Sequence, residues 1–424
     1  MTEIERYDAV IIGDDLASAM AGALLAHRGC TVRLLETSCP TWRNDGPLFG
    51  LFTSPTAKCI IEALDLGPAL RSRVDGPPEA ITVALPDRCF LLPPSDPDRR
   101  QVLAAMFPDA HEALAGLLEA IEVGGPQLDP LLDGTVTFEA DTFAGRRAWR
   151  RRQMQFASTG GGGTVSIPSH GPLRQLVDAL LAFAGHRPAR DQALNPAAIR
   201  ALWHVLHGLL PYRGGREGLR RLFVDRMRRA GGVVTRGAPV EALAVGWRKA
   251  RAAILGDGTR VEARGFLVGA EPTLSRLLPH ASETDTATVQ YLRVHAPWEE
   301  RPDGLRGLCA WTPAGDGAAC RLRVDDDGFE VRWRGDGEPP KVAGLSPLGT
   351  MTPEALAAYV DADGGRHDAY GLYRRPLAGP MGNLGVLGEW IIPGLGLESD
   401  CLTAWHGASF MARFGRRRAA STAH

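Results

Sequence analysis

The segment from Tyr7 to Glu36 constrains the fold of this chain more than any other part of its sequence. An apolar run predicts a buried strand, a glycine marks a tight turn, and a run of small residues predicts a helix that a second glycine ends. A second strand then carries an acid at its carboxyl end. In chain order these features are Ala9–Ile12, Gly13, Leu16–Arg28, Gly29, Thr31–Leu35 and Glu36. The segment therefore predicts a βαβ unit, and with it an α/β fold containing a parallel sheet.

The spacing of this unit matches the dinucleotide-binding pattern, but its glycines do not. Glu36 follows the turn at about the twenty-residue separation needed to hold a ribose hydroxyl. The pattern has glycine at the first, third and sixth places of the turn, where this chain has Gly13, Asp15 and Ser18. Glycine at the third place lets a diphosphate approach the backbone, and Asp15 puts a carboxylate there. The βαβ unit thus predicts that the chain binds a nucleotide, whereas the acidic side chain in its loop opposes nucleotide binding.

Two interpretations of the loop follow from its acids. If Asp15 faces a diphosphate, two like charges about 4 Å apart repel by roughly 4 kcal/mol at an effective dielectric near 20. The helix N-terminus stabilises a nearby anion by roughly 0.3 to 2 kcal/mol, so the repulsion between the two charges is the larger effect. Alternatively, Asp14 or Asp15 is the N-cap of the helix and accepts the amide hydrogens that a phosphate would take.

Composition limits the remaining classes of function. A chain of 424 residues, of which 44% are hydrophobic, exceeds what one core usually supports, so two domains are expected. The formal net charge of -1 argues against a nucleic-acid partner. The first residues lack a basic region followed by an apolar stretch, and no apolar run reaches membrane-spanning length, so neither a signal peptide nor a membrane span is expected. The seven cysteines are widely spaced without a Cys-x-x-Cys pair, which indicates reduced thiols in a cytoplasmic protein.

Three blocks of sequence carry a resemblance to a known family. The first is the βαβ unit, the second is a glycine-rich helix start with the strand and turn that follow it, and the third is a glycine turn near the carboxyl end. The matching residues are Glu36, then Gly214-Gly215, Gly218-Leu219 and Gly237–Val240, then Gly388-Glu389 and Pro393–Glu398. Through them the chain resembles the FAD-dependent oxidoreductases of the phytoene desaturase and amine oxidase type over nearly its whole length.

The resemblance implies FAD as the cofactor and assigns it a set of contacts. Glu36 would hold the adenosine ribose, Val240 would meet the adenine through its backbone, and the third block would open a helix beneath the isoalloxazine. The full set is Gly13, Asp14, Asp15, Leu16, Ser18, Glu36, Val240, Gly388, Glu389, Gly394, Leu395 and Gly396. The implied reaction is hydride transfer from a small apolar or amine substrate to the flavin N5, with oxygen, a quinone or a partner protein as the final acceptor. The resemblance names no catalytic side chain.

The predicted architecture is a Rossmann-like FAD-binding domain made of discontinuous segments, with an inserted α+β substrate domain. Residues 1–85, 205–275 and 376–424 are assigned to the FAD-binding domain, and residues 86–204 and 276–375 to the inserted domain. The reason is that the segments after Leu85 leave the βαβ rhythm, which returns near Pro211.

Departures from the family pattern keep other functions open. The Gly-Gly-Arg type segment that wraps the flavin is missing after Glu36, Glu389 stands in place of an aspartate, and Trp405 and His406 replace small residues. One alternative is a flavoprotein-fold pseudoenzyme that has lost FAD and acts as a binding or assembly partner. Another is a carrier of a lipid or isoprenoid without redox chemistry.

Two further groups of residues have both a functional and a structural interpretation. His204 and His207 could share a metal, but without a ligand-spaced acid or cysteine nearby they are better explained as core or surface histidines. Arginine runs at 146–152 and 416–418, and the basic side of a predicted helix at 219–229, could make a peripheral membrane contact. A solvated helix face explains the same helix pattern equally well.

Overall fold

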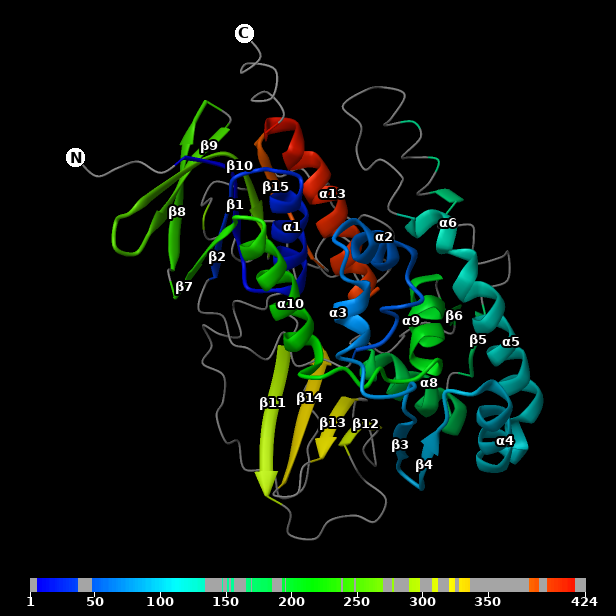
Figure 1. Ribbon diagram of the computed structural model, residues 1–424. Helices are drawn as coiled ribbons and strands as arrows, with labels where there is room; N and C mark the ends of the chain where they lie inside the picture. The colour runs from blue at the N-terminus through cyan, green and yellow to red at the C-terminus, as the bar shows by residue number, and fades with distance from the viewer. Residues whose placement is uncertain are drawn as a thin grey trace.

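The computed structural model has two main β-sheets with helices packed against both (Figure 1). It describes residues 6–36, 48–133, 147, 151, 154–155, 165–168, 170–184, 193–194, 196–237, 239–247, 249–269, 277, 290–297, 307–311, 320–324, 328–335, 381–388 and 395–415. The two sheets and the helices packed against them belong to this described part of the chain.

The first sheet has seven strands in the order β7-β2-β1-β10-β9-β8, with β15 paired to β10. Its parallel strands are β1 (Arg6–Ile12), β2 (Val32–Glu36), β7 (Val233–Arg236), β10 (Arg260–Val268) and β15 (Leu384–Val386). The strands β8 (Val240–Gly246) and β9 (Lys249–Leu255) extend it as an antiparallel hairpin. The predicted βαβ unit is confirmed, because β1 and β2 are parallel neighbours joined by α1 (Leu16–His27).

Three helices pack side by side against this sheet. The helix α1 lies between α10 (Gly215–Arg229) and α13 (Leu397–Gly415), and every α1 residue from 16 to 26 is buried. Its small residues permit this packing: a Cβ on Gly22 would lie 2.6 Å from the sulfur of Met227 on α10. The helix is therefore apolar on all sides because it is covered on all sides.

The second sheet has six strands in the order β11-β14-β13-β12-β3-β4. These are β11 (Gln290–Pro297), β14 (Gly328–Gly335), β13 (Cys320–Val324), β12 (Gly307–Trp311), β3 (Ile81–Leu85) and β4 (Arg88–Leu92). A separate hydrophobic core joins it to α4 (Asp96–Met106), α5 (His111–Gln127), α8 (Pro172–Phe183) and α9 (Pro196–Leu206). The smaller elements are α2 (Pro55–Ala63), α3 (Gly67–Arg71), α6 (Asp129–Leu132), the 3-10 turn Pro108–Ala110, β5 (Val165–Ser166) and β6 (Ala193–Leu194).

The strand β3 lies in a different sheet from the one that the sequence suggested. The boundary drawn after residue 85 falls inside the β3–β4 hairpin, whose two strands pair antiparallel across a two-residue turn. Apolar residues in a strand show that it is buried, but they do not show in which sheet it is buried.

Within the described part of the chain, no helix combines the length and the apolar character that crossing a bilayer would need.

Candidate cofactor site

The candidate site lies at the carboxyl edge of the first sheet, where β1 ends at Ile12 and β2 ends at Glu36. Ligands of open α/β sheets bind outside this edge. The helices α1 and α13 both begin there. The Met20 and Cys401 sulfurs lie 3.9 Å apart, and Arg28 Nη1 donates to Ser409 Oγ at 3.3 Å, so the two helices run in the same direction.

This pairing places the two helix N-termini level with each other. Met20 is four residues after the start of α1 at Leu16, and Cys401 is four residues after the start of α13 at Leu397. Each N-terminus carries a partial positive charge from its free amide groups. The fold therefore points two anion-favouring helix ends at one edge of one sheet.

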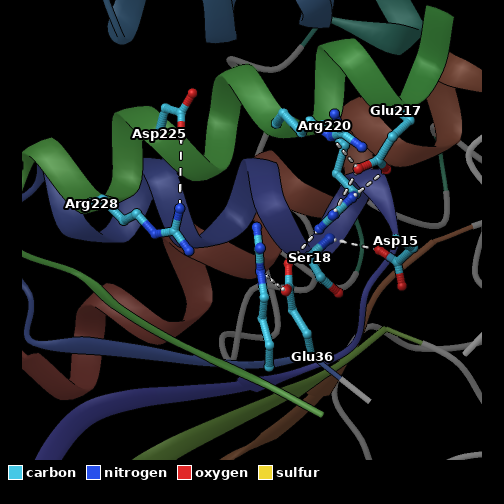
Figure 2. A network of polar contacts seen from close by, with 9 residues as sticks. Asp15, Ser18, Glu36, Glu217, Arg220, Asp225 and Arg228 are labelled. Atoms are coloured by element: carbon cyan, nitrogen blue, oxygen red, sulfur yellow. Dashed lines mark hydrogen bonds and ion pairs between the residues drawn. The ribbon is translucent and has the colours of Figure 1, made fainter. Parts of the chain in front are cut away.

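In the loop between β1 and α1, close packing requires a glycine at position 13. A Cβ on Gly13 would lie 2.5 Å from Ser18 Oγ and 3.2 Å from the Cα of Gly269 at the end of β10. Asp15 is the N-cap of α1, and its Oδ1 accepts the backbone N–H of Ser18 at 2.7 Å (Figure 2). The N-cap interpretation of the loop is confirmed for Asp15.

The Asp15 carboxylate is held inward, against the end of the sheet. A Cβ on Gly269 would lie 2.0 Å from Asp15 Oδ2, so this oxygen fills the space above β10. Asp14 beside it is half-buried, and Leu16 is fully buried as the first residue of α1. The helix end already holds a negative charge. The residues present do not fit a diphosphate unless the carboxylate moves or is removed.

Glu36 keeps the position predicted for a ribose-binding acid and has two arginine partners. Its Oε1 accepts from Arg220 Nη1 at 2.5 Å, and its Oε2 accepts from Arg236 Nε at 3.1 Å. Arg220 also donates to both carboxylate oxygens of Glu217, one turn earlier on α10 (Figure 2). Burial opposes the charge of Arg220, but the hydrogen bonds from Glu217 and Glu36 outweigh it and raise the Arg220 pKa.

The Glu36 carboxylate still has acceptor capacity. An ionised carboxylate offers about four lone-pair sites, and the arginines use one oxygen each. Arg236 is 64% exposed and can turn away easily, whereas Arg220 is 10% exposed and is fixed. Glu36 therefore fits a ribose diol. Val240, predicted to meet the adenine, is buried and begins β8 shortly after Arg236; its contact with adenine remains a prediction.

At the flavin end of the predicted site, the described residues form the start of α13. The N–H of Gly388 donates to Thr403 Oγ1 at 2.9 Å, which ties the strand end after β15 to the helix. Leu395 is buried, and Gly396 has φ of 54°, a left-handed conformation that suits glycine. Glu389 and Gly394 lie outside the described residues.

The first turn of α13 carries two buried acids that sequence reasoning missed. Glu398 is bound by Arg200 of α9 through two hydrogen bonds of 2.8 Å, and Asp400 is paired with Arg216 of α10. The Nε2 atom of His204 lies 3.0 Å from Glu398 Oε2. The sequence signal was an acidic first turn on an otherwise apolar helix, but the partners lie almost two hundred residues away.

Burial and charge set the ionisation of this cluster. Burial raises the pKa of Glu398, but Arg200 and His204 outweigh burial and hold that pKa well below its usual range. Burial lowers the pKa of His204 despite the nearby carboxylate. The cluster therefore contains an ionised glutamate, a charged arginine and a neutral imidazole.

The histidines have structural roles in the described part of the chain. His204 Nδ1 lies 3.1 Å from Thr53 Oγ1, and His207 Nδ1 lies 2.7 Å from the carbonyl oxygen of Trp203. Among the described residues, no cluster of three or more metal-ligating side chains occurs. The core interpretation of His204 agrees with these contacts, and Glu398 is the acid partner that sequence spacing did not show.

No protein-family model and no curated protein matches this chain. Solved structures do. An oxidoreductase from Methanosarcina mazei superposes with a TM-score of 0.50 at 12% identity, covering 96% of this chain and 100% of that one. A geranylgeranyl bacteriochlorophyll reductase-like protein from Thermoplasma acidophilum gives 0.44 at 10% identity, covering 98% and 83%. A probable FAD-dependent monooxygenase from Pseudomonas aeruginosa gives 0.43 at 13% identity, covering 99% and 88%.

At these identities the likeness concerns the fold alone. The chain has a mixed α/β fold with a parallel sheet, and it shares this fold with the oxidoreductase from Methanosarcina mazei. The predicted fold class is confirmed.

Proposed function

We propose that this chain is an FAD-dependent oxidoreductase, of the phytoene desaturase or amine oxidase type, that oxidises a small apolar or amine substrate. The observation that carries the proposal is the convergence at one sheet edge. The N-termini of α1 and α13 and the carboxylate of Glu36 come from distant parts of the sequence and lie at the carboxyl edge of the sheet, outside which open α/β sheets bind ligands.

In this proposal, the ribose, the flavin and the diphosphate of FAD each lie next to a different part of the site. Glu36 fits the adenosine ribose because it keeps free acceptor sites. The α13 N-terminus suits the electron-rich edge of a flavin. The diphosphate position does not fit as it stands, because Asp15 takes the Ser18 N–H and brings its own charge. When bound, the flavin would supply the redox chemistry, and the chain would bind and orient it.

Asp15 therefore limits FAD affinity in this proposal. We expect Asp15→Asn to tighten FAD binding at least about tenfold, or about 1.4 kcal/mol. Asparagine keeps an oxygen for the Ser18 N–H, so the cap survives, while the repulsion of roughly 4 kcal/mol at 4 Å and dielectric 20 is removed. The measurement is equilibrium titration of the purified full chain with FAD, followed by flavin absorbance and fluorescence.

The matched control is Asp98→Asn, which removes one charge from the exposed first turn of α4 near the second core. It should leave FAD affinity unchanged. Binding by neither the wild type nor Asp15→Asn would refute the proposal. Equal affinity of the wild type and Asp15→Asn would show that the Asp15 carboxylate does not oppose the diphosphate.

A second candidate is favoured by the same loop geometry. The helix end is capped by Asp15, and each oxygen of Glu36 already has an arginine partner, as expected for a pseudoenzyme that binds or assembles with a partner. Under this candidate the wild type does not bind FAD, and Asp15→Asn restores binding. The titration of the two proteins therefore separates the two candidates.

A further inference from the structure

The hairpin of β8 and β9 carries the most exposed large apolar side chain in the described part of the chain. Trp247 follows the last residue of β8, Gly246, and is 94% exposed. Its φ of 34° is in the left-handed region. Two-residue hairpin loops favour Asn or Gly at such positions, and a bulky residue there is an outlier. Trp247 is thus unfavourable both in conformation and in exposure.

Unfavourable backbone conformations that persist in a fold cluster at active sites, ligand-binding sites and switch regions. The apolar surface at the hairpin tip extends beyond Trp247, because Val245 on β8 is 52% exposed. On β9, Ala250 and Ala252 are buried, whereas the residues that alternate with them are exposed. The hairpin is therefore packed on one side, and its tip presents apolar surface to solvent.

Two exposed cations flank the tryptophan. Lys249 begins β9, and Arg251 lies two residues further on, so both side chains project from the same face of the strand. Arg251 reaches back over the turn, since a Cβ on Gly246 would lie 2.5 Å from its Nε. Neither cation has an ion pair with any described residue. The tip therefore combines an exposed indole with positive charge.

The size of the tip decides what it binds. A stable protein partner needs roughly 800 Å² on each side, whereas a Trp side chain offers about 150–250 Å². A lipid surface needs no preformed complement. Tryptophan settles at the headgroup level, and each nearby Lys or Arg adds attraction to anionic lipid. We infer that the β8–β9 tip docks the protein on the surface of an anionic lipid bilayer, with Trp247 at the headgroup level and Lys249 and Arg251 on the lipid phosphates.

The test is co-sedimentation of the full chain with vesicles of phosphatidylglycerol and phosphatidylcholine, compared with phosphatidylcholine alone. We expect binding to the anionic vesicles that weakens with salt. Trp247→Ala should lower the partition coefficient at least about tenfold, and Lys249→Gln or Arg251→Gln about fivefold each, or about 1 kcal/mol.

Two further variants separate binding from folding and from general stickiness. Trp247→Gly relieves the positive φ, so it should lose vesicle binding without lowering the thermal unfolding midpoint. Leu91→Ala removes an exposed apolar side chain, 59% exposed, from β4 of the second sheet and should not change binding.

Failure of the wild type to bind anionic vesicles would overturn the inference, as would undiminished binding by Trp247→Ala. Concentration-dependent dimerisation that Trp247→Ala abolishes, without vesicle binding, would instead assign the tip to a second copy of the chain. None of these readouts depends on FAD.

Discussion

At the residue scale, single carboxylates determine what this site can hold. Asp15 caps α1 at the position proposed for the diphosphate, and Glu398 ties the first turn of α13 to Arg200 of α9. Both acids lie at helix N-termini, where negative charge is stabilised. The chain's own side chains thus already place negative charge at the helix ends where the proposed FAD would bind.

Removing one partner of the Glu398–Arg200 pair would leave a buried charge without its buried counter-charge. The side chains are 1% and 0% exposed, so Glu398→Gln leaves a buried guanidinium with Asp129 as its remaining acid partner. We expect the free energy of unfolding in urea to fall by about 3 kcal/mol or more. The control Arg213→Ala breaks an ion pair with exposed partners, of 68% and 52%, and should cost at most about 1 kcal/mol. Equal losses of unfolding free energy in the two variants would mean that breaking the buried ion pair costs no more than breaking the exposed one.

His204 makes stability depend on pH. Burial lowers the pKa of His204 in the folded state below the ordinary value of 6.5. On acidification, the imidazole is therefore protonated in the unfolded chain before it is protonated in the folded chain. The burial of His204 does not lower the free energy of unfolding above about pH 6.5, and it lowers that free energy progressively as the pH falls below this value. Between about pH 7 and pH 5, the loss of unfolding free energy should be smaller in His204→Gln than in the wild type. Identical slopes in the two proteins would contradict this account.

At the scale of elements, close helix contacts depend on particular glycines. On α5, a Cβ at Gly125 would lie 2.3 Å from the Trp203 ring of α9, whereas a Cβ at Gly116 on the same helix would meet open space. We expect Gly125→Ala to lower the thermal midpoint, at a cost of about 1–3 kcal/mol. Gly116→Ala should raise it, by about 0.5–1 kcal/mol. A gain from both substitutions would show that the α5–α9 contact is loose.

Elements defined by local signals were predictable from sequence. The strand–helix–strand unit around α1 follows from its apolar runs and from Gly29. The sheet that contains β3 was not predictable, because β3 would be equally apolar in either sheet. The partners of Glu398 were hidden for another reason: ion pairs between distant segments leave no periodic pattern. For Asp15 the sequence offered two interpretations, and only the geometry of the loop decided between them.

At the scale of the whole molecule, segments from both ends of the chain and from its middle assemble the first sheet and the three helices beside it (Figure 1). A ligand at their shared edge would bind the folded chain and not the unfolded one. The coupling is quantitative: a ligand at one hundred times its Kd stabilises the folded state by about 2.7 kcal/mol.

The most direct test of the proposed function is the thermal unfolding midpoint of the wild-type chain as FAD is increased. The oxidoreductase proposal predicts a midpoint that rises with FAD concentration, accompanied by a flavin spectrum that stays with the protein through gel filtration or returns on titration. A midpoint unchanged at every FAD concentration, in a protein that stays colourless, would contradict it.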